Sequence, residues 1–275
     1  MTDATQGMLF GSLVPDATGD PAVGDEHQLR ICALNVNSPS LSRAQRLADW
    51  LLSAKATVLV LSELRPSDGG RLLLNILAAE GFDVHCTPGW QTSPYLAAVA
   101  SRGLSARSLT PQPFDPRIAA VDLSAAGGTV RVVGVYAPTN GMTSDSSRQR
   151  QAFQRSLLTY LTGIRTPDLC VAGDLNVVEP DHHPHLPDFA PHDYAFYTGL
   201  LDLDLIDAYR TLTPDGGDHS WLSDRYGRQR LDHTFISPHL GKVSVCTYDH
   251  TPRADRLTDH AALLTTIDLT CGGSQ

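Results

Sequence analysis

Apolar residues follow two alternating patterns along the chain, short continuous runs and helical spacings. Residues 29–36 form an apolar run and residues 57–61 a β-branched run, and both are typical of buried strands. Further strand-like runs occupy residues 82–87, 95–101, 117–123, 130–136, 168–173, 218–222, 230–236, 243–248 and 262–269. Helical spacing predicts helices within residues 44–52, 72–77 and 153–164 and near 193–201. Many strands with few helices, and no repeat or linker between them, predict one α/β domain in which two sheets pack face to face inside outer helices.

The first 28 residues differ in composition from the rest. They are rich in Gly, Asp, Ala and Thr, contain no Lys or Arg, and predict a flexible acidic N-terminal tail before a single domain over residues 29–275. The net charge of −9 argues against a broadly basic nucleic-acid-binding surface. More than half of that charge lies in the tail, whose acids are Asp3, Asp16, Asp20, Asp25 and Glu26.

Arginine is the predominant basic residue, since only Lys55 and Lys242 of the 21 basic residues are lysines. The forked guanidinium suits phosphate oxygens, although a GC-rich genome produces the same bias. Arg225 and Arg230 are predicted to contact substrate. They belong to a cluster in the last third of the chain that indicates either a phosphate-facing patch or a solvated face: Arg225, Arg228, Arg230, Arg253 and Arg256.

The five cysteines are far apart and form no CxxC pair. This favours reduced core thiols over disulfides or a zinc site. No apolar stretch approaches the roughly 20 residues of a membrane span, and the N-terminus lacks the basic and apolar segments of a secretory signal. We therefore expect a monomeric cytoplasmic protein that makes no membrane contact.

Polar residues that can carry chemistry lie at the ends of the predicted strands. They are Asn35, Asn37, Glu63, Tyr136, Asp174, Asn176, Asp232, Asp259 and His260. A single polar residue at a strand end is usually a turn former or a cap. In a sandwich, however, the strand ends meet at one rim, so these carboxylates, amides and one imidazole are expected to converge there.

The converging side chains favour magnesium over zinc. Mg²⁺ prefers oxygen ligands and often uses only one or two carboxylates together with a substrate phosphate, and a cation would offset the repulsion between clustered acids. Glu63 ends a buried run and is the first candidate ligand. His260 beside Asp259, with Asp232 elsewhere in the chain, is the pattern of an imidazole oriented by a carboxylate. A surface turn would also explain the pair Asp259-His260.

The same residues fall in seven blocks whose order resembles the endonuclease/exonuclease/phosphatase superfamily. The blocks read LNVN, LSE, VYAP, AGDLNV, the SW of HSW, RLDH and TDH. The match extends from about Leu29 to Leu269, and GDLN with the late DH pair is its most specific part. The branch they resemble most is the exonuclease III type of apurinic/apyrimidinic endonuclease. The resemblance implies a four-layer α/β sandwich, two packed mixed β-sheets flanked by helices, with a site that hydrolyses phosphoesters using Mg²⁺ or Mn²⁺.

The resemblance also implies roles for the metal-binding and charge-stabilising residues. Glu63 would be the main metal ligand, with Asn37 nearby. His260, held by Asp232, would stabilise charge on the phosphoryl oxygens. Asp259 would help to place the metal or His260.

Four further residues would act on water and phosphate by the same resemblance. Asp174 would orient or deprotonate the attacking water, and Asn176 would hold that water and a phosphate oxygen. Asn35 would support Asp174. Tyr136 would contact the phosphate or the leaving group.

Two departures from the family pattern bear on the substrate. Exonuclease III-type enzymes often carry a His-Gly pair before the strand at residues 95–99, and none is present here. Their abasic-sugar pocket commonly pairs Phe with Trp, whereas here Ser220 precedes Trp221. Trp221 and Leu231 would line a smaller apolar pocket, unless Trp221 is simply a core residue.

Two functions remain open at this level. The first is a metal-dependent DNA phosphodiesterase of DNA repair, acting as an abasic-site endonuclease, a 3′→5′ exonuclease, or both. The alternative is a metal-dependent phosphoesterase for a small nucleotide, a sugar phosphate or a lipid head group. A non-enzymatic scaffold is disfavoured because no catalytic residue is missing. The His-rich loop 181–192 matches no standard zinc spacing and is interpreted as incidental or as shaping substrate entry.

Overall fold

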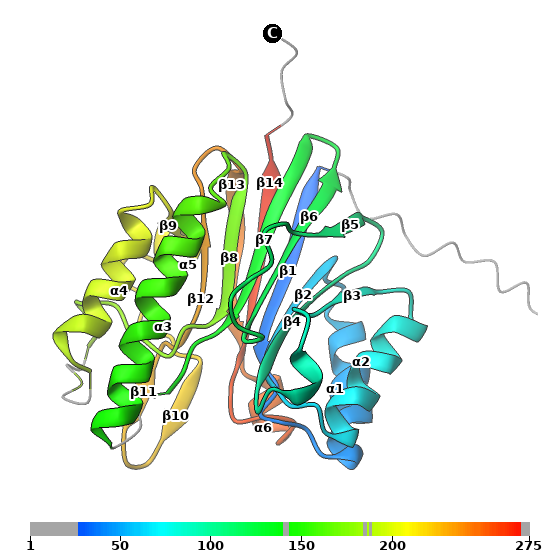
Figure 1. The fold of residues 1–275 in the computed structure, drawn as a ribbon, viewed down its shortest axis with the longest axis horizontal. Coiled ribbons are helices and arrows are strands. Elements are labelled where there is room, and N and C mark those ends of the chain that lie inside the picture. Colours follow the sequence, from blue (N-terminus) through cyan, green and yellow to red (C-terminus); the bar gives the residue numbers. More distant parts are fainter. Residues whose placement is uncertain (1–26, 140–142, 184–185, 187–188, 271–275) are drawn as a thin grey trace, which may run out of the picture.

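The computed structural model describes residues 27–139, 143–183, 186 and 189–270. This part of the chain contains two six-stranded sheets that lie against each other (Figure 1). The first sheet consists of β1 (Gln28–Asn35), β2 (Val58–Leu64), β3 (Asp83–His85), β4 (Leu96–Ser101), β13 (Gly241–Asp249) and β14 (Ala262–Leu269). The second consists of β5 (Ser105–Ser108), β6 (Ile118–Ala125), β7 (Gly128–Tyr136), β8 (Leu169–Asp174), β9 (Ile206–Asp207) and β12 (Asp232–Ile236).

Both sheets are mixed. Their strand orders are β13-β14-β1-β2-β4-β3 and β5-β6-β7-β8-β12-β9, with β1 parallel to β2 and β7 parallel to β8. Helices cover the outer faces (Figure 1): α1 (Leu41–Ser53) and α2 (Asp68–Ala79) on the first sheet, α3 (Ser144–Gly163) and α4 (Pro191–Leu201) on the second. These layers confirm the predicted four-layer α/β sandwich.

The continuous apolar runs arise because both faces of each sheet are covered. In β1, Ile31 and Ala33 point into the core between the sheets, while Cys32 and Leu34 pack against the helices outside. Successive residues of a strand face opposite sides, so a strand buried on both sides needs apolar residues at every position. The predicted helical spacing is also confirmed, since α1 buries Ala44, Leu47, Ala48 and Leu51.

The sequence prediction differs from the structure mainly in short elements. The strand predicted at 218–222 begins only at Trp221, as the first strand of a hairpin made of β10 (Trp221–Ser223) and β11 (Gly227–Gln229). The strand predicted at 82–87 is limited to β3. Short helices α5 (Ala208–Leu212) and α6 (Thr251–Ala254) were not predicted. Elements of three to five residues are too short to show a period.

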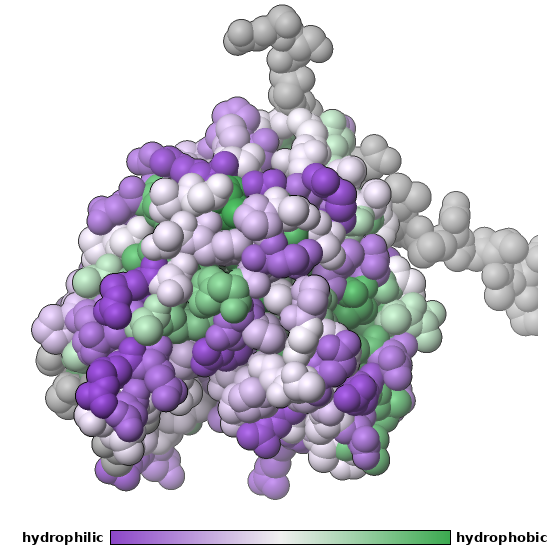
Figure 2. Space-filling view, in the orientation of Figure 1, coloured by the Kyte–Doolittle hydropathy of each residue, from purple (hydrophilic) through white to green (hydrophobic). Residues whose placement is uncertain are grey.

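Several expectations concern the surroundings of this fold. Residues 1–26 and Cys271 lie outside the described residues, so the acidic tail stays a prediction. The first strand, β1, begins at Gln28, one residue before the expected strand. Among the described residues the cysteines are unpaired, with Cys32, Cys170 and Cys246 buried. None of the described helices is long and apolar enough to cross a membrane. Hydrophilic side chains predominate on the face in Figure 2, and apolar ones form scattered patches.

Candidate active site

Strand register brings three of the predicted site residues side by side. At one end of the second sheet Asp174 of β8 pairs with Tyr136 of β7 on one side and with Asp232 of β12 on the other. The preceding Gly173 has a φ of +126°, and a Cβ there would lie 2.2 Å from the carbonyl oxygen of Val135. Only glycine therefore allows the close strand approach that carries Asp174 into place.

A cavity of about 310 Å³ opens at this end of the sandwich. Its polar lining includes the predicted residues Glu63, Asp174, Asn176, Asp259 and His260, and its apolar lining includes Trp221 and Leu231. The expected convergence of strand ends is thus observed. The remaining lining residues are Thr139, Arg150, Phe189, Tyr226 and Gln229.

Asp174 is buried and accepts several hydrogen bonds. Its Oδ2 accepts from Asn35 Nδ2 at 2.8 Å and from Asn176 Nδ2 at 3.2 Å, and its Oδ1 accepts from the backbone N–H of Asn176 at 2.9 Å. Burial, together with the nearby carboxylate of Asp232, raises the pKa of Asp174 to about 7. A carboxylate with this pKa suits a general base near neutral pH.

Glu63 is tied to Asp174 through one shared amide. Asn35 Nδ2, which donates to Asp174, also donates to Glu63 Oε2 at 2.9 Å. Glu63 has a φ of +53° and lies where the register between β2 and β4 shifts. Such irregularities redirect a side chain, and non-glycine residues at positive φ cluster at functional sites. The irregularity explains how a residue of a buried strand reaches the cavity.

Asp259 connects the cavity to the hairpin. Its Oδ1 accepts from Asn37 Nδ2 at 2.7 Å, and its Oδ2 accepts from the indole N–H of Trp221 at 3.1 Å. Asn37 thus uses its nitrogen, which leaves its Oδ1 as the atom able to bind a cation. The carboxylates of Glu63 and Asp259 and this amide oxygen offer oxygen donors only, which is the donor type that Mg²⁺ and Mn²⁺ prefer.

His260 and Asp232 form the predicted imidazole–carboxylate pair. His260 Nδ1 lies 2.7 Å from Asp232 Oδ2, and both residues are buried. Burial by itself lowers the pKa of His260, but the carboxylates of Asp232, Asp174 and Asp259 outweigh it and raise the pKa to about 9. The imidazole is therefore protonated at pH 7, and its Nε2–H is a charged donor.

Tyr136 remains a hydrogen-bond donor at neutral pH. Its ring lies 5.5 Å from that of Tyr95, centroid to centroid. Burial raises the pKa of Tyr136 well above its usual value, and the carboxylates of Asp174 and Glu63 raise it further. A phenol that keeps its proton beside these acids can donate to an anionic substrate.

Comparison with known proteins agrees with this geometry. A family model described as the Endonuclease/Exonuclease/phosphatase family matches residues 32–260. The chain belongs to this family of phosphoester hydrolases. The comparison with curated proteins gives no match.

Solved structures of the family share the fold. An AP endonuclease from Archaeoglobus fulgidus is 21% identical with a TM-score of 0.71, covering 88% of this chain and 100% of its own. A 3'-5' exonuclease from Neisseria meningitidis is 24% identical with a TM-score of 0.70, covering 87% of this chain and 99% of its own. A 3' phosphatase from Neisseria, bound to a product DNA hairpin, is 21% identical with a TM-score of 0.68 and the same coverages.

Two predicted substrate contacts of this family member lie outside the cavity lining. Arg230 is fully buried and forms ion pairs with Glu179 and, at 2.7 Å, with Asp207. Its position corrects the prediction, because a guanidinium enclosed between two buried acids cannot reach substrate. Arg225 is exposed in the β10–β11 turn, 5.0 Å from the ring centroid of Tyr226. Tyr226 lines the cavity, so Arg225 lies next to a cavity residue. It stays a candidate for contacts with the part of a substrate that lies outside the cavity.

Replacing Arg230 by Met is expected to lower the free energy of unfolding by about 3–5 kcal/mol, since removal of one partner leaves buried charges uncompensated. Urea unfolding monitored by circular dichroism measures the change. The matched replacement Arg225→Met concerns an exposed side chain and should stay within about 0.5 kcal/mol. Equal, small effects of both replacements would show that the buried ion pairs do not form.

Arg150 lines the cavity and was not predicted from the sequence. It is buried on α3, donates to Asp193 Oδ1 at 2.7 Å and to the carbonyl of Pro138 at 2.7 Å, and donates to the carbonyl of Asn176. It thereby fixes the backbone of a cavity residue. Its position on the helix face that also carries Phe153 was the available signal, because an arginine at a core position is rarely buried without a partner.

Proposed function

We propose that the protein is a divalent-metal-dependent phosphodiesterase that hydrolyses DNA, as an abasic-site endonuclease, a 3′→5′ exonuclease, or both, with a role in DNA repair. One observation carries the proposal. Asp174, held by Asn35 and Asn176, faces the same cavity as the protonated His260 and the oxygen donors around Glu63. The similar structures are those of an AP endonuclease, a 3'-5' exonuclease and a 3' phosphatase bound to DNA.

Each residue has a defined task in this proposal. Asp174 accepts a proton from the attacking water, which Asn176 orients, so that the nucleophile is positioned before reaction. His260 Nε2–H donates to a phosphoryl oxygen on which charge develops, and Tyr136 donates to the phosphate or to the leaving group. Glu63, Asn37 and Asp259 would hold Mg²⁺ or Mn²⁺.

A metal held there would supply charge stabilisation for the phosphoryl oxygens. Asn35 acts on two partners at once, because its Nδ2 lies 2.9 Å from Glu63 Oε2 and 2.8 Å from Asp174 Oδ2. Asn35 therefore fixes the spacing between the oxygen donors and the general base. Asp232 holds His260 from behind and keeps its proton in place.

A small phosphoester is the second candidate substrate. The cavity is about 310 Å³ and has an apolar wall that includes Trp221, Phe189 and Leu231. Arg230 is buried in ion pairs, so the arginine patch predicted for a DNA backbone is smaller than the sequence indicated. Both observations fit a compact substrate, which is the reason to test one beside DNA.

A substrate panel at several salt concentrations separates the two candidates. With Mg²⁺ we expect cleavage of abasic and linear duplex DNA, loss of that cleavage with EDTA, and a steep fall in the rate between about 50 and 200 mM salt, because DNA binding releases counterions. Turnover of a small phosphodiester alone, with little salt dependence, would assign the second function. Asp174→Asn is the control for contaminating nucleases.

A further inference from the structure

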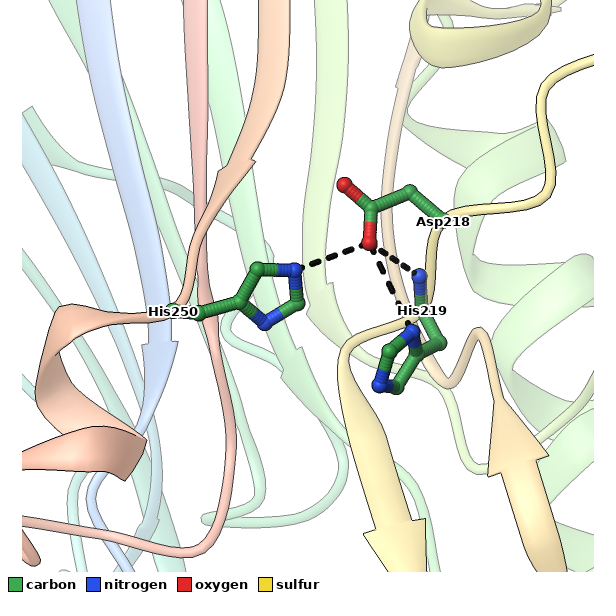
Figure 3. A group of neighbouring side chains, drawn as sticks. All are labelled: Asp218, His219 and His250. Carbon is green, nitrogen blue, oxygen red and sulfur yellow. Dashed lines mark hydrogen bonds and ion pairs between the residues drawn. The ribbon is translucent and has the colours of Figure 1, made fainter.

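Asp218, His219 and His250 form a second cluster of ligand-type side chains. Asp218 and His219 precede β10, and His250 lies between β13 and α6. Asp218 Oδ1 lies 2.8 Å from His250 Nε2 and 3.5 Å from His219 Nδ1 (Figure 3). One ligand atom from each residue lies within 4.8 Å of the others.

His219 is buried without hydrogen-bond partners for its ring. The residue is 8% exposed, and among the described residues neither Nδ1 nor Nε2 has a hydrogen-bond partner. Buried polar groups are normally satisfied, and leaving one unpaired is costly. Two imidazoles whose ring centroids are 5.1 Å apart and a carboxylate can meet this need together if a cation lies between them.

The donor set selects the kind of ion. Imidazole nitrogen and carboxylate oxygen are ligands of Zn²⁺ and related transition ions, which bind them at about 2.0–2.2 Å. Two ligands of one ion are then at most about 4.4 Å apart. A cluster that already lies within 4.8 Å needs only small side-chain rotations to reach that separation.

Two arginines adjoin the cluster and oppose a cation there. Arg253 Nη2 lies 3.0 Å from His250 Nδ1 and donates to it, so the Nε2 of His250 carries the proton that faces Asp218. Arg228 lines the adjoining cavity of about 440 Å³ with Asp218 and His219. Metal binding at His250 Nε2 moves the ring proton to Nδ1 and displaces Arg253. Arg253 therefore competes with the metal and sets its affinity.

We propose that Asp218, His219 and His250 bind a divalent transition-metal ion of the zinc type, at a site separate from the phosphoesterase centre. The ion would join the segment that leads to Trp221 to the segment between β13 and α6. Since Trp221 donates to Asp259 in the catalytic cavity, the metal would fix the hairpin that forms one wall of that cavity. The His-rich loop contributes His182 and His183 to the adjoining cavity, but the proposal does not require them.

Zinc titration of the full-length, metal-free chain tests the proposal by binding, not by activity. Excess Mg²⁺ occupies sites built from oxygen ligands, and isothermal calorimetry with elemental analysis counts the Zn²⁺ bound. We expect one equivalent, and a loss of affinity of about 100-fold in His219→Ala and in His250→Gln. Arg253→Met should bind Zn²⁺ more tightly than the wild-type chain, because the competing charged donor is gone.

Controls separate this site from others on the molecule. His239→Gln removes an exposed histidine paired with Asp168 and should leave zinc binding unchanged. Glu63→Gln alters the catalytic cavity and should also keep the equivalent of Zn²⁺. His250 is partly exposed, so His250→Gln should leave the fold intact, which circular dichroism checks. The inference is overturned if the wild-type chain binds no more Zn²⁺ than His250→Gln, or if Glu63→Gln removes the binding.

Discussion

Replacement of Asp174 by asparagine is expected to reduce kcat on the cleaved substrate by about 10²–10⁴-fold. The carboxylate accepts hydrogen bonds at both oxygens, from Asn35 and Asn176. An amide has one oxygen, so its NH₂ group must face at least one of these donors. The variant therefore loses both the proton acceptor and the geometry that holds it. Steady-state kinetics at saturating Mg²⁺ measures the loss.

The fold of this variant should survive. Burial raises the pKa of Asp174 to about 7, so the ionised carboxylate destabilises the folded wild-type chain increasingly as pH rises from about 4 to above 7. Asparagine does not titrate, so the free energy of unfolding of the Asp174→Asn variant should vary less with pH over this interval than that of the wild-type chain. Asp168 directly precedes the first residue of β8, at the end of the strand opposite to Asp174. Asp168→Asn is therefore a matched control that is expected to keep full activity. Near-normal kcat in Asp174→Asn would place the general base elsewhere.

The strand-end residues could be predicted because sheet geometry is general. Apolar runs locate the strands, and a sandwich brings their polar ends to one rim, so Asp174, Asp232 and Glu63 were identifiable without coordinates. The pairing of Asp232 with His260 also follows from residue types that commonly pair. What the sequence could not supply is the register, which places Asp174 directly between Tyr136 and Asp232.

Arg230 shows where sequence reasoning fails. Arg230 belongs to an arginine cluster near Asp232 and was predicted to contact substrate, but the direction of its side chain depends on which acids the fold buries around it. Glu179 and Asp207 come from distant segments and enclose it. The register shift at Glu63 and the β10–β11 hairpin could not be predicted either, because neither produces a periodic pattern of apolar residues in the sequence.

Replacement of His260 by alanine is expected to lower kcat by about 10²–10³-fold, the effect of removing one charged donor from the transition state. His260 Nδ1 is held by Asp232 Oδ2 at 2.7 Å, which directs Nε2–H toward the cavity. The buried Asp232 loses its partner in this variant, so His260→Gln, which retains a donor, is the less disruptive companion. Single-turnover rates separate the chemical step from substrate binding. Activity close to wild type in both variants would exclude His260 from the transition state.

Asp232→Asn distinguishes a charge role of His260 from a structural one. The carboxylates around His260 raise its pKa to about 9, and Asp232 makes the largest contribution among them. The wild-type rate should therefore fall as pH rises through about 9, when the imidazole loses its proton. Without the Asp232 charge, burial lowers the pKa of His260, so the falling limb should move toward neutral pH and should be absent from His260→Ala. A limb that stays at the same pH in Asp232→Asn would belong to another group, and His260 would then act only by packing.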